Sequence, residues 1–322
     1  MGETAPGDTD GIFRGLLAHL VGSVVGQEDA LRGLADALLA GEMGHARPGR
    51  PRSVVLLLGP TGTGKTESVL AASAHLFGAG MVARIDAAEF SSPERVPLLL
   101  GSQAGSPGIL AGRISRMRET GGRILLLDEI EKAHPWVADY LLGIEAASLT
   151  LADGRALDLS DIHVIATSNV GSEGVVGLEA VSRASVRRFV EQEAAMKFRP
   201  EVLARFSAVL VFRHLSRDVQ IEICRRMLGD ELAHQGRVLS RVLGHPHRVL
   251  GGPEVCRRLV AEGWHRSLGA RPMRNAVERR VRSALVAARL RGAIGPGLTS
   301  SVLVAAAGEG LRAAPSRVPV RL

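Results

Sequence analysis

Runs of mostly apolar residues alternate, over the first two thirds of the chain, with stretches in which apolar residues recur every three or four positions. The runs have strand length, and apolar residues on both faces are typical of buried strands in a parallel sheet. They cover residues 54–58, 81–86, 124–127, 162–167 and 208–212. A helical pattern at 28–40 precedes the first run, and others at 65–77, 109–117 and 135–147 lie between the later ones. This alternation predicts an α/β fold, a parallel sheet with helices on both faces.

The pattern changes after residue 213, where long amphipathic helices dominate. We expect helices at 217–234, 253–262 and 272–290, with one late strand at 301–305. A hairpin at 149–159, turning at Asp153–Gly154, precedes the change. The pattern therefore predicts an N-terminal tail (1–23), a large α/β domain (24–212) and a small, mostly helical domain (213–322). A Gly/Pro/Arg linker at 41–52 leads into the first strand.

Composition narrows the class of protein. Of the 322 residues, 46% are hydrophobic and 23% are charged, which is typical of a globular protein with a real core. The longest apolar runs are far below the ~18 residues of a membrane span. The first ten residues are polar and acidic, unlike a signal peptide, so we expect a loose tail and a cytoplasmic protein. The two cysteines, Cys224 and Cys256, are too few for a disulfide framework and are expected to be buried thiols.

The chain is basic, with a net charge of +7 and a pI near 10.5. An excess of basic over acidic residues is compatible with a nucleic-acid partner. Only three of the 40 basic residues are lysines, however, and arginines are spread over the whole chain. Aromatic residues make up 3%, which leaves little for stacking on bases. Nucleic acid is therefore a possible partner but not the favoured one.

The strongest chemical signal follows the first predicted strand and precedes a predicted helix. It fits the phosphate-binding loop pattern Gly-x4-Gly-Lys-Ser/Thr. The loop consists of Gly59, Pro60, Thr61, Gly62, Thr63, Gly64, Lys65 and Thr66. Glycines let backbone N–H groups converge on phosphate oxygens, and the helix N-terminus adds partial positive charge. We expect Lys65 to reach the β- and γ-phosphates of ATP and Thr66 to ligate Mg²⁺.

Two further strands end in polar residues that suit hydrolysis. The run at 124–127 ends in Asp128 and Glu129. Asp128 is suited to holding Mg²⁺ through water, and Glu129 to activating the attacking water as a general base. The next strand ends in Thr-Ser-Asn, and the amide of Asn169 could orient that water. A general base aimed at water indicates a hydrolase.

Taken in order, these motifs resemble the AAA-plus ATPases of the Clp family, specifically the C-terminal ATPase module of Clp-type protein unfoldases and disaggregases. The matching segments are VGQEDA from residue 25, GPTGTGKTE from 59, RIDAAEF from 84, LLLDEIEKAH from 125, LTLADGRALD from 149, TSNVGS from 167, FRPEVLARF from 198 and GAR from 269. Together they cover most of the chain. DEIEKAH and FRPE are more specific than an ATP-binding motif alone.

The resemblance implies roles within one subunit. Val25 and Gly26 would lie beside the adenine, and Asn169 would be the first sensor of the γ-phosphate. Arg271, in the small helical domain, would be the second sensor and would make that domain a lid over the nucleotide. ATP and Mg²⁺ are the implied cofactors.

The resemblance also implies contacts between subunits, because family members assemble as hexameric rings. Arg205 would be the arginine finger that reaches the nucleotide of the neighbouring subunit, and Arg199 is the second choice for an interface role. Hydrolysis would then remove the γ-phosphate contacts of Arg205 and Arg271, and the domains would rotate. The implied function is remodelling of a protein client, with or without an adaptor.

One position departs from the family pattern. Unfoldases of this family carry an aromatic residue in a pore loop that grips the substrate, and the aligned residue here is Ser106. A serine offers no comparable apolar contact, which argues against threading by an aromatic grip at this position.

Two other functions remain open from the sequence. One is a remodeller or loader of nucleic acid, which the basic pI favours and the scarcity of aromatic residues opposes. The other is a regulatory module that uses ATP only as a conformational switch, for which very slow turnover and nucleotide-dependent partner binding would be diagnostic.

Overall fold

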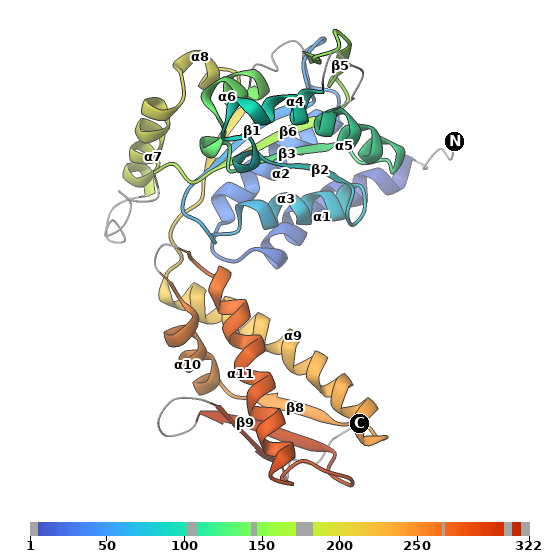
Figure 1. The fold of residues 1–322 in the computed structure, drawn as a ribbon, viewed down its shortest axis with the longest axis vertical. Helices are drawn as coiled ribbons and strands as arrows, with labels where there is room; N and C mark the ends of the chain where they lie inside the picture. Colours follow the sequence, from blue (N-terminus) through green and yellow to red (C-terminus); the bar gives the residue numbers. More distant parts are fainter. Residues whose placement is uncertain are drawn as a thin grey trace. The chain divides into compact units, whose positions relative to one another are not determined.

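The computed structural model describes residues 6–101, 108–142, 147–171, 183–265, 268–305 and 311–316. The chain divides into two compact units, Met1–His214 and Leu215–Leu322 (Figure 1). The division falls two residues after the 212/213 boundary that the sequence predicts. The segment containing Ser106 lies outside the described residues.

A five-stranded parallel sheet forms the centre of the first unit, as predicted (Figure 1). Its strands, in spatial order, are β2 (Val82–Asp86), β3 (Ile124–Asp128), β6 (His163–Ser168), β1 (Ser53–Leu58) and β7 (Ala208–Val211). Every neighbouring pair is parallel. All strands therefore end at the same edge of the sheet, which gathers the residues that follow them.

Helices cover both faces of this sheet. Along β1, Val55 and Leu57 face one apolar cluster while Leu56 and Leu58 face the other. The first cluster includes residues of α1 (Pro6–Ser23), α2 (Glu28–Glu42) and α3 (Lys65–Leu76). The second includes residues of α4 (Val96–Leu100), α5 (Gly108–Glu119), α6 (Pro135–Leu142), α7 (Arg183–Lys197) and α8 (Pro200–Leu203). Burial on both sides explains the continuous apolar runs of the strands.

Smaller elements complete this unit. The predicted hairpin is present as β4 (Ser148–Thr150) and β5 (Ala156–Asp158), which pair antiparallel. Three 3₁₀ turns are η1 (Ala87–Phe90), η2 (Pro93–Arg95) and η3 (Ile130–Lys132). Among the described residues, no helix is long and apolar enough to cross a membrane.

The prediction of a loose N-terminal tail was wrong for the described part of that segment. Helix α1 spans Pro6–Ser23 and packs against α3. Leu16 and Leu20, one turn apart, are fully buried. Four glycines, at positions 7, 11, 15 and 22, lower the helix propensity of this segment and hide its apolar stripe. Burial of that stripe against α3 outweighs the low propensity.

The second unit is helical, as predicted, but it also contains a small sheet. Its helices are α9 (Arg217–Leu243), α10 (Pro253–Gly263) and α11 (Arg271–Leu290). Its strands, in the order β10-β9-β8, are β10 (Leu311–Pro315), β9 (Ser300–Ala305) and β8 (Arg248–Gly251). Only β9 was predicted. Cys224 and Cys256 are buried in the core of this unit, as expected.

A buried polar network lies at the start of the central strands. Glu42 accepts hydrogen bonds from Arg52 (3.2 Å) and Arg123 (2.9 Å) and lies 3.0 Å from His163 Nε2. The other ring nitrogen of His163 lies 2.8 Å from Ser53 Oγ. Burial lowers the pKa of His163, although the hydrogen bond with Glu42 opposes this shift. Burial raises the pKa of Glu42, but the hydrogen bond to His163 and the two arginines outweigh it and lower that pKa overall.

Acidification should therefore destabilise the first unit. Because the pKa of His163 is lower in the folded than in the unfolded chain, the unfolded chain takes up a proton first as the pH falls below about 6.5. We expect the free energy of unfolding to fall by about 1 kcal/mol between pH 7.5 and 5.5 from this group. Denaturant unfolding at both pH values measures the effect. His163→Gln should reduce the change in unfolding free energy between the two pH values. If the change is as large in this variant as in the unaltered chain, other groups cause it.

Candidate functional site

The phosphate-loop pattern forms the connection between β1 and α3, at the carboxyl edge of the sheet. Gly59, Gly62 and Gly64 have φ values of 130°, 71° and 104°, a region that residues with a Cβ disfavour. A Cβ on Gly59 would lie 2.2 Å from the Phe212 carbonyl oxygen, and one on Gly64 would lie 2.6 Å from a Val24 methyl group. Glycine is therefore required at both positions for the loop to curl.

Lys65, the first residue of α3, lies inside this loop. Its side chain is buried, and its ammonium group donates to the carbonyl oxygens of Gly59 (2.6 Å) and Pro60 (2.8 Å). It also donates to Asn169 Oδ1 at 3.0 Å. The loop thus surrounds the positively charged ammonium group of Lys65. This group contacts both the loop that follows β1 and Asn169, which follows β6.

Asp128, the last residue of β3, is the second charge of the site. It accepts hydrogen bonds from Thr66 Oγ1 at 3.0 Å and Thr167 Oγ1 at 2.5 Å. Arg84, on the neighbouring strand β2, pairs with it at 2.5 Å. The two strands that flank β3 and the loop helix therefore supply the groups that contact this one buried carboxylate.

Glu129 follows Asp128 in a left-handed backbone conformation with a φ of 55°. This conformation is uncommon for a residue other than glycine and often marks a functional site. The Glu129 N–H donates to Thr167 Oγ1 at 3.1 Å, and its carboxylate lies 3.5 Å from Asn169 Nδ2. Lys132 pairs with the same carboxylate at 2.5 Å, and that hydrogen bond raises the Lys132 pKa.

Asn169 contacts three charged side chains of the site, those of Lys65, Glu129 and Glu131. Its Oδ1 accepts from Lys65, and its Nδ2 contacts Glu129 and donates to Glu131 Oε1 at 2.9 Å. The other oxygen of Glu131 is buried and has no hydrogen-bond partner among the described residues. The amide is held between the base candidate and the loop, where it can orient a small molecule such as water.

The segment carrying Val25 and Gly26 runs beside the loop. Val24 contacts Gly64, and the Gln27 side chain forms hydrogen bonds with both backbone groups of Arg213 at 2.8 and 3.0 Å. Val25 and Gly26, which has a φ of 77°, lie between these two anchors. Their predicted place beside the base of a bound nucleotide is compatible with this position.

Three predicted arginines lie elsewhere. Arg205 precedes β7 at the amino edge of the sheet, whereas the loop is at the carboxyl edge. Arg199 caps α8 and pairs with Asp139 at 3.5 Å. Arg271 is the first residue of α11, in the second unit. The first unit therefore brings together Lys65 and the acidic and amide groups, but not these arginines.

Sequence reasoning did not single out Arg84 and Thr167, the two side chains that contact Asp128 from the neighbouring strands β2 and β6. Both residues occur within the matched segments. Their contact with Asp128 follows from the pairing of β2 and β6 with β3, and the sequence alone does not reveal which strands pair.

The site fits a magnesium–nucleotide pair. Thr66 and Asp128 offer oxygen atoms that can ligate a metal, and these lie within hydrogen-bond distance of each other beside the loop that carries Lys65. Among the described residues there is no group of three or more His, Cys, Asp or Glu side chains arranged for a metal. Mg²⁺ commonly binds to one or two protein groups together with water and substrate phosphates, so these donors suit it.

Two family profiles match the chain. Residues 50–209 match the profile described as AAA domain (Cdc48 subfamily), and residues 247–302 match the C-terminal, D2-small domain, of ClpB protein. Both matches agree with the division into two units. The second profile includes β8, part of the small sheet that the sequence pattern had not predicted.

Known proteins match most of this chain in sequence, and a solved structure matches it in fold. A ClpA homolog described as an ATP-dependent Clp protease ATP-binding subunit, from Pyropia yezoensis, is 34% identical over 90% of this chain and 36% of its own length. The chaperone protein ClpB of Pseudomonas putida is 34% identical over 85% of this chain and 32% of its own length. The solved structure of the S. cerevisiae Hsp104–ADP complex matches 95% of this chain and 53% of that chain, with a TM-score of 0.77 and 28% identity. This chain thus spans about a third of the length of the two Clp relatives and about half of the Hsp104 chain.

Proposed function

The chain belongs to the Clp family of AAA-plus ATPases, and on that basis we propose that it hydrolyses ATP within a ring of identical subunits to remodel a protein partner. One observation carries this proposal. Lys65, Asp128, Glu129 and Asn169 meet at the carboxyl edge of the sheet, although the sequence separates them by up to 104 positions. This is the edge where open parallel sheets bind their ligands.

The loop and its neighbours would bind ATP and Mg²⁺. The loop N–H groups, the α3 N-terminus and Lys65 would hold the phosphates. Thr66 and Asp128 would hold Mg²⁺, which supplies charge neutralisation on the phosphate oxygens when bound. Lys65 would exchange its present loop carbonyl partners for phosphate oxygens.

Glu129 and Asn169 would act on the water that attacks the γ-phosphate. Glu129 would accept the proton of that water, and Asn169 would fix its position. Lys132, paired with Glu129, would have to release the carboxylate before it could serve as the base. The left-handed backbone at Glu129 aims the side chain toward Asn169 and supports this assignment.

The position of Arg205 supports action across a subunit boundary. Six residues of β1 separate the linker end of the sheet from the phosphate loop, a distance of roughly 20 Å. Arg205, beside the start of β1, is therefore poorly placed for the nucleotide of its own subunit. We propose that it serves a neighbouring subunit of a hexameric ring and that Arg271 serves the nucleotide of its own subunit.

The client is proposed to be a protein. A solved structure with a TM-score of 0.79 and 26% identity is described as Hsp104 with ATPγS and FITC casein, and several relatives are described as chaperones. A cytoplasmic location is proposed as well.

The test is capture of the client by a variant that binds ATP without cleaving it. Glu129→Gln, immobilised in the presence of ATP and Mg²⁺, should retain a defined set of proteins that ADP releases. The matched control is Glu119→Gln, which changes an exposed glutamate at the end of α5. Retention of nucleic acid, with ATPase activity that nucleic acid stimulates and salt suppresses, would favour the alternative of a nucleic-acid remodeller.

Arg84 should tune the requirement for magnesium. Its guanidinium pairs with the carboxylate that is proposed to hold Mg²⁺, so it competes with the metal for Asp128. We expect Arg84→Ala to lower the Mg²⁺ concentration for half-maximal ATPase activity by about 3-fold, since half-exposed ion pairs are worth up to about 1 kcal/mol. Titration of Mg²⁺ at fixed ATP measures this. A higher requirement in the variant would mean that Arg84 orients Asp128 for the metal.

A further inference from the structure

Glu131, two residues beyond the proposed base, carries a side chain that the proposed mechanism does not use. Its Oε1 accepts a hydrogen bond of 2.9 Å from Asn169 Nδ2. Its Oε2 is buried and has no hydrogen-bond partner among the described residues. A buried carboxylate oxygen without a partner lowers the stability of the fold, so stability alone gives no reason for an acid here. Such departures are expected at functional sites.

The backbone that carries Glu131 is anchored close to the proposed base. Glu131 is the middle residue of η3, the 3₁₀ turn that begins directly after Glu129. Ile130, in the same turn, is fully buried in the apolar core, and the Lys132 N–H donates to the Glu129 carbonyl oxygen at 2.9 Å. These contacts fix the backbone at Glu129 and Glu131 relative to each other.

The amide of Asn169 needs a partner that decides which way it points. An amide has an oxygen that accepts and a nitrogen that donates, and a half-turn of the group exchanges the two. The nitrogen lies 2.9 Å from Glu131 Oε1 but 3.5 Å from Glu129 Oε1, which is at the limit for a hydrogen bond. Glu131 therefore makes the stronger contact and turns the nitrogen toward the acidic side chains.

The contact with Glu131 is also the one that can persist during turnover. Lys65 now donates to Asn169 Oδ1 at 3.0 Å, but in the proposed function it moves to the phosphates. Glu129 turns to the attacking water in the same mechanism. Both groups then change their contact with the amide, whereas Glu131 has neither task. It can hold the amide in one orientation while ATP is bound.

We propose that Glu131 is a positioning residue for ATP hydrolysis, which holds the amide of Asn169 in the orientation that fixes the attacking water. This inference rests on the proposed function and extends it, because it adds an acid that is neither the base nor a metal ligand. Glu131 affects the rate only through Asn169, with which it forms its hydrogen bond.

A double-mutant cycle on the rate of ATP hydrolysis tests this role. Glu131→Ala removes the acceptor and should lower kcat by at least ~10-fold, since a hydrogen bond to a charged group contributes about this factor or more. Asn169→Ala should lower kcat by at least as much. Because Glu131 acts through Asn169, the double variant should be as fast as Asn169→Ala, within about 2-fold. Two independent effects would multiply instead.

Binding measurements separate positioning from a general loss of structure. The probes are ADP and ADP with aluminium fluoride, both with Mg²⁺, and the second mimics the phosphoryl group during transfer. Glu131→Ala should bind ADP within about 3-fold of the unaltered chain. It should bind the mimic at least ~10-fold more weakly, because only the mimic includes the groups that Asn169 helps to hold. Isothermal titration measures both affinities.

Three further variants separate the acceptor oxygen from the size and charge of the side chain. Glu131→Gln keeps an oxygen that can accept from Asn169, so it should retain at least about one third of kcat. Glu131→Met has a similar length but no such oxygen, so it should be as slow as Glu131→Ala without leaving a cavity. The matched control is Glu94→Ala, which removes an exposed glutamate from another 3₁₀ turn, η2, and should keep the full rate.

Three results would overturn the proposal. The first is an unchanged kcat in both Glu131→Ala and Glu131→Met. The second is a double variant slowed by the product of the two single effects, because the residues would then act independently. The third is a Glu131→Gln variant as slow as Glu131→Met, because the charge and not the acceptor would then matter. Absence of ATPase activity in the unaltered chain would instead refute the proposed function itself.

Discussion

Replacement of Glu129 by glutamine should reduce the rate of ATP hydrolysis by at least ~100-fold, because a positioned general base contributes about that much or more. Glutamine keeps the size of the side chain and its contact with Asn169 but cannot accept the proton of the attacking water. ATP binding should remain, since the loop, Lys65 and Asp128 are unchanged. Steady-state turnover and equilibrium binding of ATP, measured on the same preparation, separate the two effects.

Two comparisons make this result decisive. Glu119→Gln, far from the loop in sequence, should keep the full rate. Glu129→Asp retains an acid but shortens the side chain, so it should recover only a small part of the activity. If Glu129→Gln cleaves ATP at the original rate, the base lies elsewhere, and Glu131, whose buried oxygen has no partner among the described residues, becomes the first residue to replace.

Replacement of Lys65 by alanine should weaken ATP binding by roughly 100-fold and eliminate detectable turnover, since hydrogen bonds to charged groups are worth about 1.5–3 kcal/mol each. The ammonium group lies inside the loop and bonds to the carbonyl oxygens of Gly59 and Pro60 and to Asn169, so its loss also removes the side-chain contact between the loop and Asn169. Isothermal titration with an ATP analogue measures the loss of affinity.

The chain offers a matched control for this substitution, because it has only three lysines. Lys197, exposed at the end of α7, can be changed to alanine without touching the loop. Lys197→Ala should bind and cleave ATP normally. Both variants should unfold at the same temperature as the unaltered chain, which would show that the loss of ATP affinity in Lys65→Ala comes from the site. If both variants lost the same affinity for ATP, Lys65 would not have its assigned role.

The centre of the sheet could be predicted from sequence because strands β3, β6 and β1 are buried on both faces. Each of these strands is a run of mostly apolar residues, and the motifs that follow them fix their direction. The parallel order follows from the helices between them. The cluster of Lys65, Asp128, Glu129 and Asn169 was predictable for the same reason, since parallel strands end at one edge.

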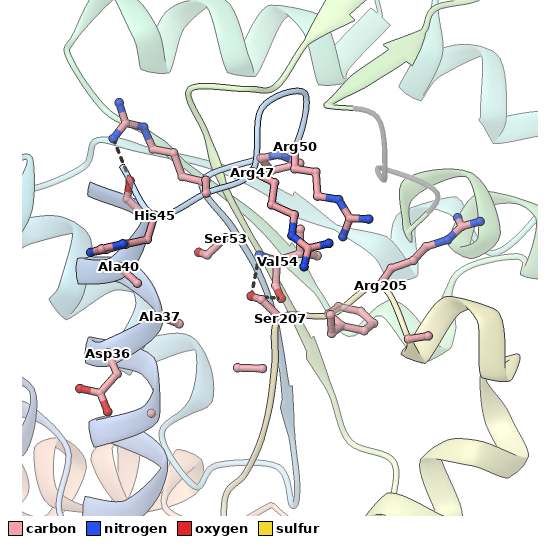
Figure 2. A pocket seen from close by; sticks show the side chains of 18 residues that line it. Asp36, Ala37, Ala40, His45, Arg47, Arg50, Ser53, Val54, Arg205 and Ser207 are labelled. Atoms are coloured by element: carbon pink, nitrogen blue, oxygen red, sulfur yellow. Dashed lines mark hydrogen bonds between the residues drawn. The ribbon is translucent and has the colours of Figure 1, made fainter. Parts of the chain in front are cut away.

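Elements that depend on tertiary contacts could not be predicted in this way. Helix α1 has weak helix propensity and exists because its apolar stripe covers α3. Strands β8 and β10 are short and lie in the helical unit, where β9 supplies their hydrogen-bond partners. The pairing of Arg84 with Asp128 and the gathering of Arg47, Arg50 and Arg205 around one cavity (Figure 2) depend on which segments become neighbours in space.

The contact between α1 and α3 has a practical consequence for protein production. A chain shortened to begin at residue 24 would lose the helix that covers α3, the helix that starts with Lys65. The hydrophobic surface that Leu16 and Leu20 now cover would be exposed to solvent. Such a shortened protein should aggregate during purification and bind nucleotide weakly, even though every motif of the ATPase is still present in it.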